Sequence, residues 1–263
     1  MSVQKSEETA RSGSGNESSR KLLSLLFSFT EENHTQSVND LATYLGAPVS
    51  TVYRYVGLLR EFGILEEAER GRYQVSMRAV GLARAARAAA GGVAAIARPY
   101  LDQLARETGE TALIVKRIGH SVVAVDIAES HQAVRLRFER GALMSLHQGA
   151  AARLLLATMP PAQRQAYYRA VRGTTGEIAG LPDEAELRAV AEQGWAESFG
   201  QVEEGIWGCS AAIFDGGEMV AALAVAGPLY RLFDTRRQDI ITAVRRVADE
   251  INQDLAGRLR GTS

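Results

Sequence analysis

Two short amphipathic patterns, SVNDLATYLG over residues 37–46 and STVYRYVGLLREFG over residues 50–63, are separated by only three residues. Each repeats apolar side chains at the spacing of a helix. The run RKLLSLLFSF, over residues 20–29, has the same spacing and ends at polar residues. Three short helices in such close succession predict a small helical bundle in this part of the chain.

Serine and glycine residues stand where the two later helices should begin and end. Ser37 is placed as the N-cap of the second helix, with Asp40 three residues later, and Gly46 is placed to end it. Ser50 is placed as the N-cap of the third helix, and Gly63 is placed to end it. These positions set the expected bounds of both helices.

The third helix divides into two faces. Its inward face is apolar and consists of Val52, Tyr55, Val56, Leu59 and Phe62. Its outward face carries hydroxyl, phenol and guanidinium groups on Ser50, Thr51, Tyr53 and Arg54. Such groups can bond base edges and phosphates when the start of a helix enters the major groove of DNA. The alternative is that Tyr53 and Arg54 only solvate an amphipathic helix.

The next segment, ILEEAERGRYQV, favours the DNA-binding interpretation, because two β-prone runs flank a turn at residues 69–71. A hairpin after the bundle is a wing, and Arg70 and Arg72 near its tip are placed to contact a phosphate or the minor groove. The alternative partners of these arginines are Glu66, Glu67 and Glu69. Residues 18–76 contain six Lys or Arg against seven Asp or Glu, and the whole chain has a net charge of −1. DNA binding therefore depends on where individual charges lie.

Composition and pattern together divide the chain into four parts. Residues 1–19 are rich in Ser, Glu and Gly and have no apolar face, so we expect a disordered tail before a DNA-binding domain at residues 20–76. The run MRAVGLARAARAAA, followed by two glycines, predicts a linker helix within residues 77–92. Residues 93–263 then form a larger domain.

The larger domain alternates helical and β-prone runs. A helix is expected over residues 96–108, followed by β-prone runs at residues 111–118, 121–130 and 131–138. Helices are then expected after Gly149, after Pro161, after Asp183 and from Phe233, with a hairpin of residues 207–215 and 218–227 before the last. Hairpins outnumber crossovers, so the sequence predicts an α+β fold with an antiparallel sheet covered on one face by helices.

Composition also limits the class of protein. Apolar residues make up 46% and charged residues 23%, as in ordinary globular domains. There is no apolar run of about 20 residues and no secretory signal, so we expect a cytoplasmic protein. The single cysteine, Cys209, excludes an intrachain disulfide and a thiolate zinc site. The four histidines lack metal-ligand spacing, and no nucleophile elbow or phosphate-binding loop occurs, so we expect no catalytic residue, metal or cofactor.

Residues 37–75 resemble the helix-turn-helix and wing of the isocitrate lyase regulator family, IclR. The residues that carry this resemblance are Leu41, Ala42, Gly46, Ser50, Thr51, Val52, Arg54, Gly63, Leu65 and Glu66. The larger domain is similar to the family's effector-binding domain, which has a GAF-like or profilin-like fold. There the matching segments are residues 146–157, 203–209 and 224–228.

The resemblance implies that the larger domain binds a small organic acid or aromatic compound. The positions that match the family's pocket are Leu146, Gly149, Ala150, Cys209, Ala224 and Ala226, with Glu203 or Glu204 as the acidic partner. The alternative for the apolar members is core packing. The family often has serines at the places of Ala224 and Ala226, so a more apolar pocket and a larger or aromatic effector are expected. A helix that starts at Gly149 and Ala150 would offer backbone N–H groups to a carboxylate.

We therefore expect a DNA-binding transcriptional regulator, a repressor or an activator, that is controlled by a small-molecule effector. A winged module gains specificity by binding two half-sites, so a homodimer or a dimer of dimers is expected. Effector binding would change the placement of two winged modules through the linker helix. Two alternatives from other classes are an enzyme with a catalytic larger domain and a protein-binding scaffold.

Overall fold

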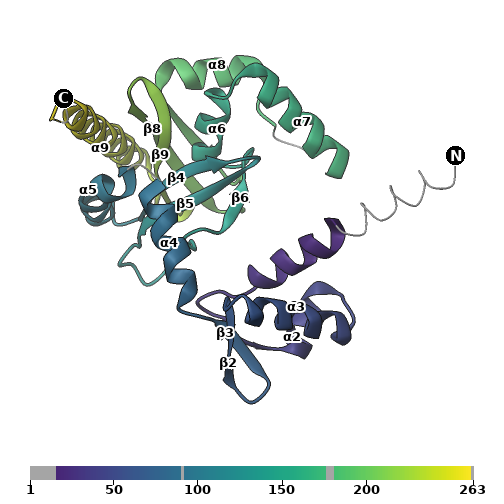
Figure 1. Cartoon of the computed structure of the whole chain (residues 1–263). Helices are drawn as coiled ribbons and strands as arrows, with labels where there is room; N and C mark the ends of the chain where they lie inside the picture. Colours follow the sequence, from purple (N-terminus) through teal and green to yellow (C-terminus); the bar gives the residue numbers. More distant parts are fainter. Residues whose placement is uncertain (1–15, 90–91, 176–180, 262–263) are drawn as a thin grey trace, which may run out of the picture. The chain divides into compact units, whose positions relative to one another are not determined.

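The computed structural model of the chain describes residues 16–89, 92–175 and 181–261 (Figure 1). The chain divides into two compact units, an N-terminal unit of residues 1–89 and a C-terminal unit of residues 90–263. The helix predicted as a linker, α4 (Arg78–Ala89), belongs to the N-terminal unit. No helix in the described parts of the chain is long and apolar enough to cross a membrane.

The N-terminal unit combines helices with a three-stranded antiparallel sheet of order β1-β3-β2. Before α4 its elements are a helix through residues 16–26, β1 (Thr35–Ser37), α2 (Val38–Leu45), α3 (Val49–Glu61), β2 (Leu65–Glu69) and β3 (Arg72–Val75). Buried side chains from the helices and the hairpin, including Leu25, Leu41, Val56 and Leu65, form one small core. This architecture confirms the predicted winged helix-turn-helix.

Local capping explains where α2 and α3 begin. The Ser37 hydroxyl accepts a hydrogen bond from the Asp40 backbone N–H, and the Asp40 carboxylate accepts one from the Ser37 N–H, so Ser37 caps α2 as predicted. Gly46 ends this helix in the left-handed conformation, with φ 57°. The prediction that Ser50 caps α3 is wrong, because the N-cap is Pro48. Proline has no N–H and a fixed φ, so it fits at the start of a helix, and Ser50 falls in the first turn.

The N-terminal unit shows three further differences from the sequence prediction. Residues 16–19, which composition assigned to the tail, are helical, and the Ser18 hydroxyl lies 3.0 Å from that of Tyr55; residues 1–15 lie outside the described residues. Phe62 is 59% exposed instead of inward-facing, because α3 ends before it and Leu65 fills the core. Strand β1 was not predicted, since three residues are too short to show alternation.

The C-terminal unit is built on a six-stranded antiparallel sheet of order β6-β5-β4-β9-β8-β7 (Figure 1). Its strands are β4 (Thr111–Ile118), β5 (Ser121–Ala128), β6 (Leu143–Ser145), β7 (Trp195–Phe199), β8 (Ile206–Asp215) and β9 (Glu218–Pro228). Its helices are α5 (Val93–Thr108), α6 (Ala150–Ala157), α7 (Pro161–Thr175), α8 (Glu184–Gln193), the 3-10 helix η1 (Leu229–Arg231) and α9 (Asp234–Gly261). This confirms the α+β class.

The expectation that helices cover one face of this sheet is wrong, because both faces are covered. Ala112 and Ile114 of β4 pack with α5 and α9, whereas Leu113 and Val115, which alternate with them, pack with α6. Figure 1 shows α5 and α9 on one side of the sheet and α6, α7 and α8 on the other. Strands buried on both faces carry near-continuous apolar runs instead of alternation, as β4 and β9 do here.

Residues 131–138, predicted as a strand, form a loop. The Val134 carbonyl accepts a hydrogen bond from Arg231 at 2.8 Å, and the Leu136 carbonyl accepts one from the Thr111 hydroxyl at 3.0 Å. The edge of β5 is instead occupied by β6, in which Ser145 pairs with Ser121. The alternating sequence of residues 131–138 therefore predicted a strand that does not form. Strand β7, which does form, was not predicted from the sequence.

Candidate DNA-binding face and effector pocket

The outward face of α3 is exposed while the inward face anchors the helix. Val52, Tyr55 and Val56 are each at most 5% exposed. On the other side Ser50 and Arg54 are exposed and Tyr53 is 57% exposed, whereas Thr51 is half-buried. The Arg54 guanidinium lies 5.7 Å from the centre of the Tyr55 ring, within cation–π range. The structure therefore brings all four predicted side chains to the first turns of one helix.

The two wing arginines differ in their surroundings. Arg70 lies exposed at the turn of the β2–β3 hairpin and has no hydrogen-bond or ion-pair partner among the described residues. Arg72 donates to the Thr35 carbonyl at 2.6 Å and lies 3.7 Å from the Asp40 carboxylate. Arg72 thus joins the hairpin to the start of α2, and neither arginine pairs with the wing glutamates.

The C-terminal unit contains a cavity of about 320 Å³, here called the apolar pocket, beside the start of α6. Six of the eight residues predicted for the effector site line it, namely Gly149, Ala150, Glu203, Cys209, Ala224 and Ala226. Two predicted residues do not. Leu146 is 0% exposed and packs in the core cluster with α6, and Glu204 is not part of the lining. Of the two candidate acids, Glu203 is therefore the one at the pocket.

The helix start at the apolar pocket is open. Gly149 is the N-cap of α6 with φ 92° and makes no side-chain cap hydrogen bond, so the first backbone N–H groups of the helix have no capping partner. This positive φ favours glycine, and a Cβ atom at residue 149 would also lie only 3.0 Å from Val202 Cγ2. Both the backbone conformation and the limited space therefore favour glycine at this position. The N-terminus of α6 thus presents donors and a partial positive charge to the pocket wall.

Sequence reasoning missed one wall of the apolar pocket. The loop of residues 129–141 contributes Arg135, Leu136, Arg137 and Phe138, and the short strands β6 and β7 contribute Met144, Ser145 and Ser198. The loop residues stood in a run predicted as a strand. These loop residues line the pocket because hydrogen bonds from Thr111 and Arg231, which are distant in the sequence, hold the loop in place. No local pattern in the sequence indicates such contacts.

Burial shifts the pKa of two residues, Cys209 in the lining of the apolar pocket and His147 close to it. Burial raises the pKa of the Cys209 thiol to about 12, so this residue is a packed apolar side chain and not a reactive thiolate. Burial also lowers the pKa of His147, whose Nδ1 lies 2.6 Å from the Tyr167 hydroxyl and 3.0 Å from that of Ser145. Within the described residues, no group of three or more His, Cys, Asp or Glu could hold a metal ion.

Both units match the same protein family. Residues 18–69 match the IclR helix-turn-helix domain, and residues 87–253 match the C-terminal domain of bacterial IclR transcriptional regulators. The regulator KipR of Bacillus subtilis is 26% identical over 226 residues, which cover 83% of this chain and 89% of KipR. The regulator BhcR of Paracoccus denitrificans is 29% identical over 230 residues, which cover 84% of this chain and 81% of BhcR.

Solved structures share the fold. The IclR protein of Thermotoga maritima superimposes with a TM-score of 0.66 at 21% identity, over 90% of this chain and 97% of that one. An IclR homologue from Microbacterium hydrocarbonoxydans, crystallised with 4-hydroxybenzoate, gives a TM-score of 0.72 at 21% identity, over 89% and 97%. With its two units matched to the two domains of one family, the chain belongs to the IclR family of bacterial transcriptional regulators.

Proposed function

We propose that this regulator binds operator DNA through the start of α3 and the wing tip, and that an aromatic carboxylic acid in the apolar pocket controls it. The observation that carries the effector class is the uncapped start of α6 beside a mainly apolar cavity. Repression and activation are both compatible with this arrangement. We expect the protein in the cytoplasm, because a bacterial regulator has to bind chromosomal DNA there. We assign no catalytic step to the pocket.

The chemistry of the lining favours one ring with one carboxylate. Val115, Phe138 and Met144 offer apolar contacts, while the helix start and Arg135 offer positive charge. Ala224 and Ala226 bring no hydroxyl group, so a small polar acid would find few donors on that wall. The homologue crystallised with 4-hydroxybenzoate supports the same class of ligand.

Calorimetric titration of the full chain with benzoate, 4-hydroxybenzoate and pyruvate tests the effector class. We expect both aromatic acids to bind more tightly than pyruvate, and Ala226→Leu to weaken them at least about tenfold by filling the cavity. Ala189→Leu, on an exposed face of α8, is the matched control. Tighter binding of pyruvate, or unchanged binding to Ala226→Leu, would contradict the proposal.

DNA binding is tested with duplexes from the region upstream of the protein's own gene, at rising salt. Arg54→Ala should weaken specific binding by about 1–3 kcal/mol if Arg54 contacts a base edge, and Tyr53→Ala should also weaken it. Arg70→Ala should weaken all duplexes alike and reduce the salt dependence, as loss of a phosphate contact does. Arg84→Ala, exposed on α4, is the control, and equal losses for Arg54→Ala and Arg84→Ala would argue against the α3 face.

We further propose that the regulator acts as a homodimer or a dimer of dimers, since two winged modules bind two half-sites of a symmetric operator. Mass photometry with and without duplex should give a mass of two or four chains. A strict monomer in both states would refute this part of the proposal.

A further inference from the structure

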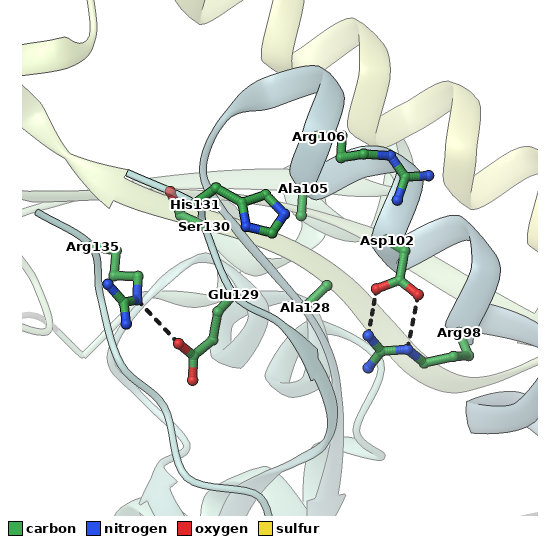
Figure 2. A pocket seen from close by; sticks show the side chains of 9 residues that line it. All are labelled: Arg98, Asp102, Ala105, Arg106, Ala128, Glu129, Ser130, His131 and Arg135. Carbon is green, nitrogen blue, oxygen red and sulfur yellow. Dashed lines mark hydrogen bonds and ion pairs between the residues drawn. The ribbon is translucent and has the colours of Figure 1, made fainter. Parts of the chain in front are cut away.

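A second cavity of the C-terminal unit, here called the polar pocket, lies between α5 and the loop that follows β5 (Figure 2). Its volume is about 450 Å³. The buried part of its lining is made of small residues, since Ala105 and Ala128 are 3% and 4% exposed and Ser130 is 3% exposed. No bulky side chain fills the hollow, and its rim carries charged groups.

The two acidic groups of the polar pocket already have partners. Arg98 binds both carboxylate oxygens of Asp102 and also donates to Asp126 and to the Ile127 carbonyl, at 3.1 and 2.9 Å. All of its hydrogen-bonding nitrogens are used in this way. Glu129 accepts from Nε of Arg135 at 3.1 Å. Each carboxylate is therefore balanced by one arginine, and neither leaves an unpaired negative charge in the pocket.

The remaining donors have no partner in the part of the chain that the structure describes. Arg106 and His131 make no hydrogen bond or ion pair there, and only Nε of Arg135 is engaged, so both terminal nitrogens of Arg135 are free. Figure 2 shows Arg106 and Arg135 on opposite sides of the hollow, with His131 between them. Arg106 comes from α5 and Arg135 from the loop, so two guanidinium groups with free N–H donors border one cavity, Arg106 unpaired and Arg135 already paired with Glu129 through Nε.

We propose that the polar pocket is a second ligand site, which binds a small dicarboxylate. A guanidinium group matches a carboxylate with two parallel hydrogen bonds, and two guanidinium groups on opposite walls suit a ligand with a carboxylate at each end. A monocarboxylate would engage one wall only. The small floor residues leave room for a short carbon chain. The polar pocket differs from the apolar pocket in its lining, and Arg135 is the residue that lines both.

Calorimetric titration of the full chain with succinate at low salt tests the proposal. Arg106 is the residue to change because it lines only the polar pocket, is exposed and makes no internal bond, so Arg106→Gln should fold normally. Loss of a charge-assisted pair predicts succinate binding weakened about tenfold or more. His131→Ala should weaken it as well. Arg188→Gln, exposed on α8, should bind succinate like the unchanged protein.

Two further measurements distinguish this site from the apolar pocket and from a general anion site. Ala226→Leu fills the apolar pocket and should leave succinate binding unchanged, so failure of the effector proposal and failure of this one give different results. Acetate and inorganic phosphate should bind at least about tenfold more weakly than succinate, because neither spans two guanidinium groups. Absence of succinate binding, equal binding by Arg106→Gln, loss of binding in Ala226→Leu, or phosphate binding as tight as succinate would each overturn the proposal.

Discussion

Replacement of Gly227 by alanine should destabilise the C-terminal unit, because the space beside this glycine is occupied by a buried carboxylate. A Cβ atom at residue 227 would lie 2.5 Å from Oε2 and 2.6 Å from Cδ of Glu110. The Glu110 side chain is only 3% exposed, and Arg231 donates to its two oxygens at 2.8 and 2.6 Å. Arg236 adds a third bond, at 3.0 Å. The carboxylate therefore has no free direction in which to move.

The magnitude follows from these bonds. Displacing Glu110 breaks charge-assisted hydrogen bonds worth about 1.5–3 kcal/mol each, and breaking a buried ion pair costs about 3–5 kcal/mol in total. The side chains of Arg231 and Arg236 are 17% and 30% exposed, so both recover some hydration when the carboxylate moves. We therefore expect Gly227→Ala to lower the free energy of unfolding by about 3 kcal/mol, at the lower end of that range.

Urea unfolding followed by tryptophan fluorescence measures this unit alone, because the chain's two tryptophans, Trp195 and Trp207, both lie in it. In a Glu110→Ala background the extra cost of Gly227→Ala should fall below about 1 kcal/mol, since the obstacle is gone. Gly257→Ala, in α9 with open space around it, should instead stabilise by about 0.5–1 kcal/mol. A cost for Gly227→Ala that is the same with and without Glu110 would refute the reasoning.

Burial and helix capping lead to three more expectations. The Cys209 thiol, whose pKa burial raises to about 12, should not react with a disulfide reagent near neutral pH until urea unfolds the protein; rapid native reaction would contradict this. Burial lowers the pKa of His147 in the folded state, so the unfolded chain takes up a proton first as the pH falls. The free energy of unfolding should therefore decrease below about pH 6.5, and urea midpoints of His147→Gln should show a smaller decrease. Asp183 caps α8 with bonds of 2.8 Å to two backbone N–H groups, so Asp183→Ala should cost about 1 kcal/mol in urea unfolding and Asp183→Asn much less.

Helix ends were predictable where a residue caps the helix through hydrogen bonds to backbone groups a few residues away. Ser37 and Asp183 cap the helices that follow them, and Gly46 ends α2, because these interactions span only a few residues. The same reasoning misplaced the start of α3, where two residues compete for the cap and proline is the one that fits. The last helix, expected from Phe233, begins one residue later, at Asp234.

The apolar pocket was partly predictable because several of its residues lie in segments that resemble the IclR effector-binding domain. Gly149 and Ala150 start a helix, and Cys209, Ala224 and Ala226 lie in strands that pair directly, since Gly208 is opposite Ala226 and Cys209 opposite Val225. Leu146 has the same apolar character but lies in the core instead of in the lining. Glu203 and Glu204 are the same residue type side by side, but only Glu203 lines the pocket. Which of two neighbouring side chains faces a pocket depends on the backbone conformation, which the sequence alone does not specify.

The order of most helices and hairpins could be predicted from the amino-acid sequence, because capping, turn formation and apolar periodicity act over a few residues. The two domains of a regulator followed from the resemblance to the IclR family. Which residues come together in a pocket or on a binding face depends on how distant elements pack. Both faces of the large sheet are covered, Arg72 fastens the wing, and bonds from Thr111 and Arg231 hold residues 131–138 as a loop in a pocket wall. These outcomes depend on contacts between residues far apart in the chain, and such contacts leave no local pattern in the sequence.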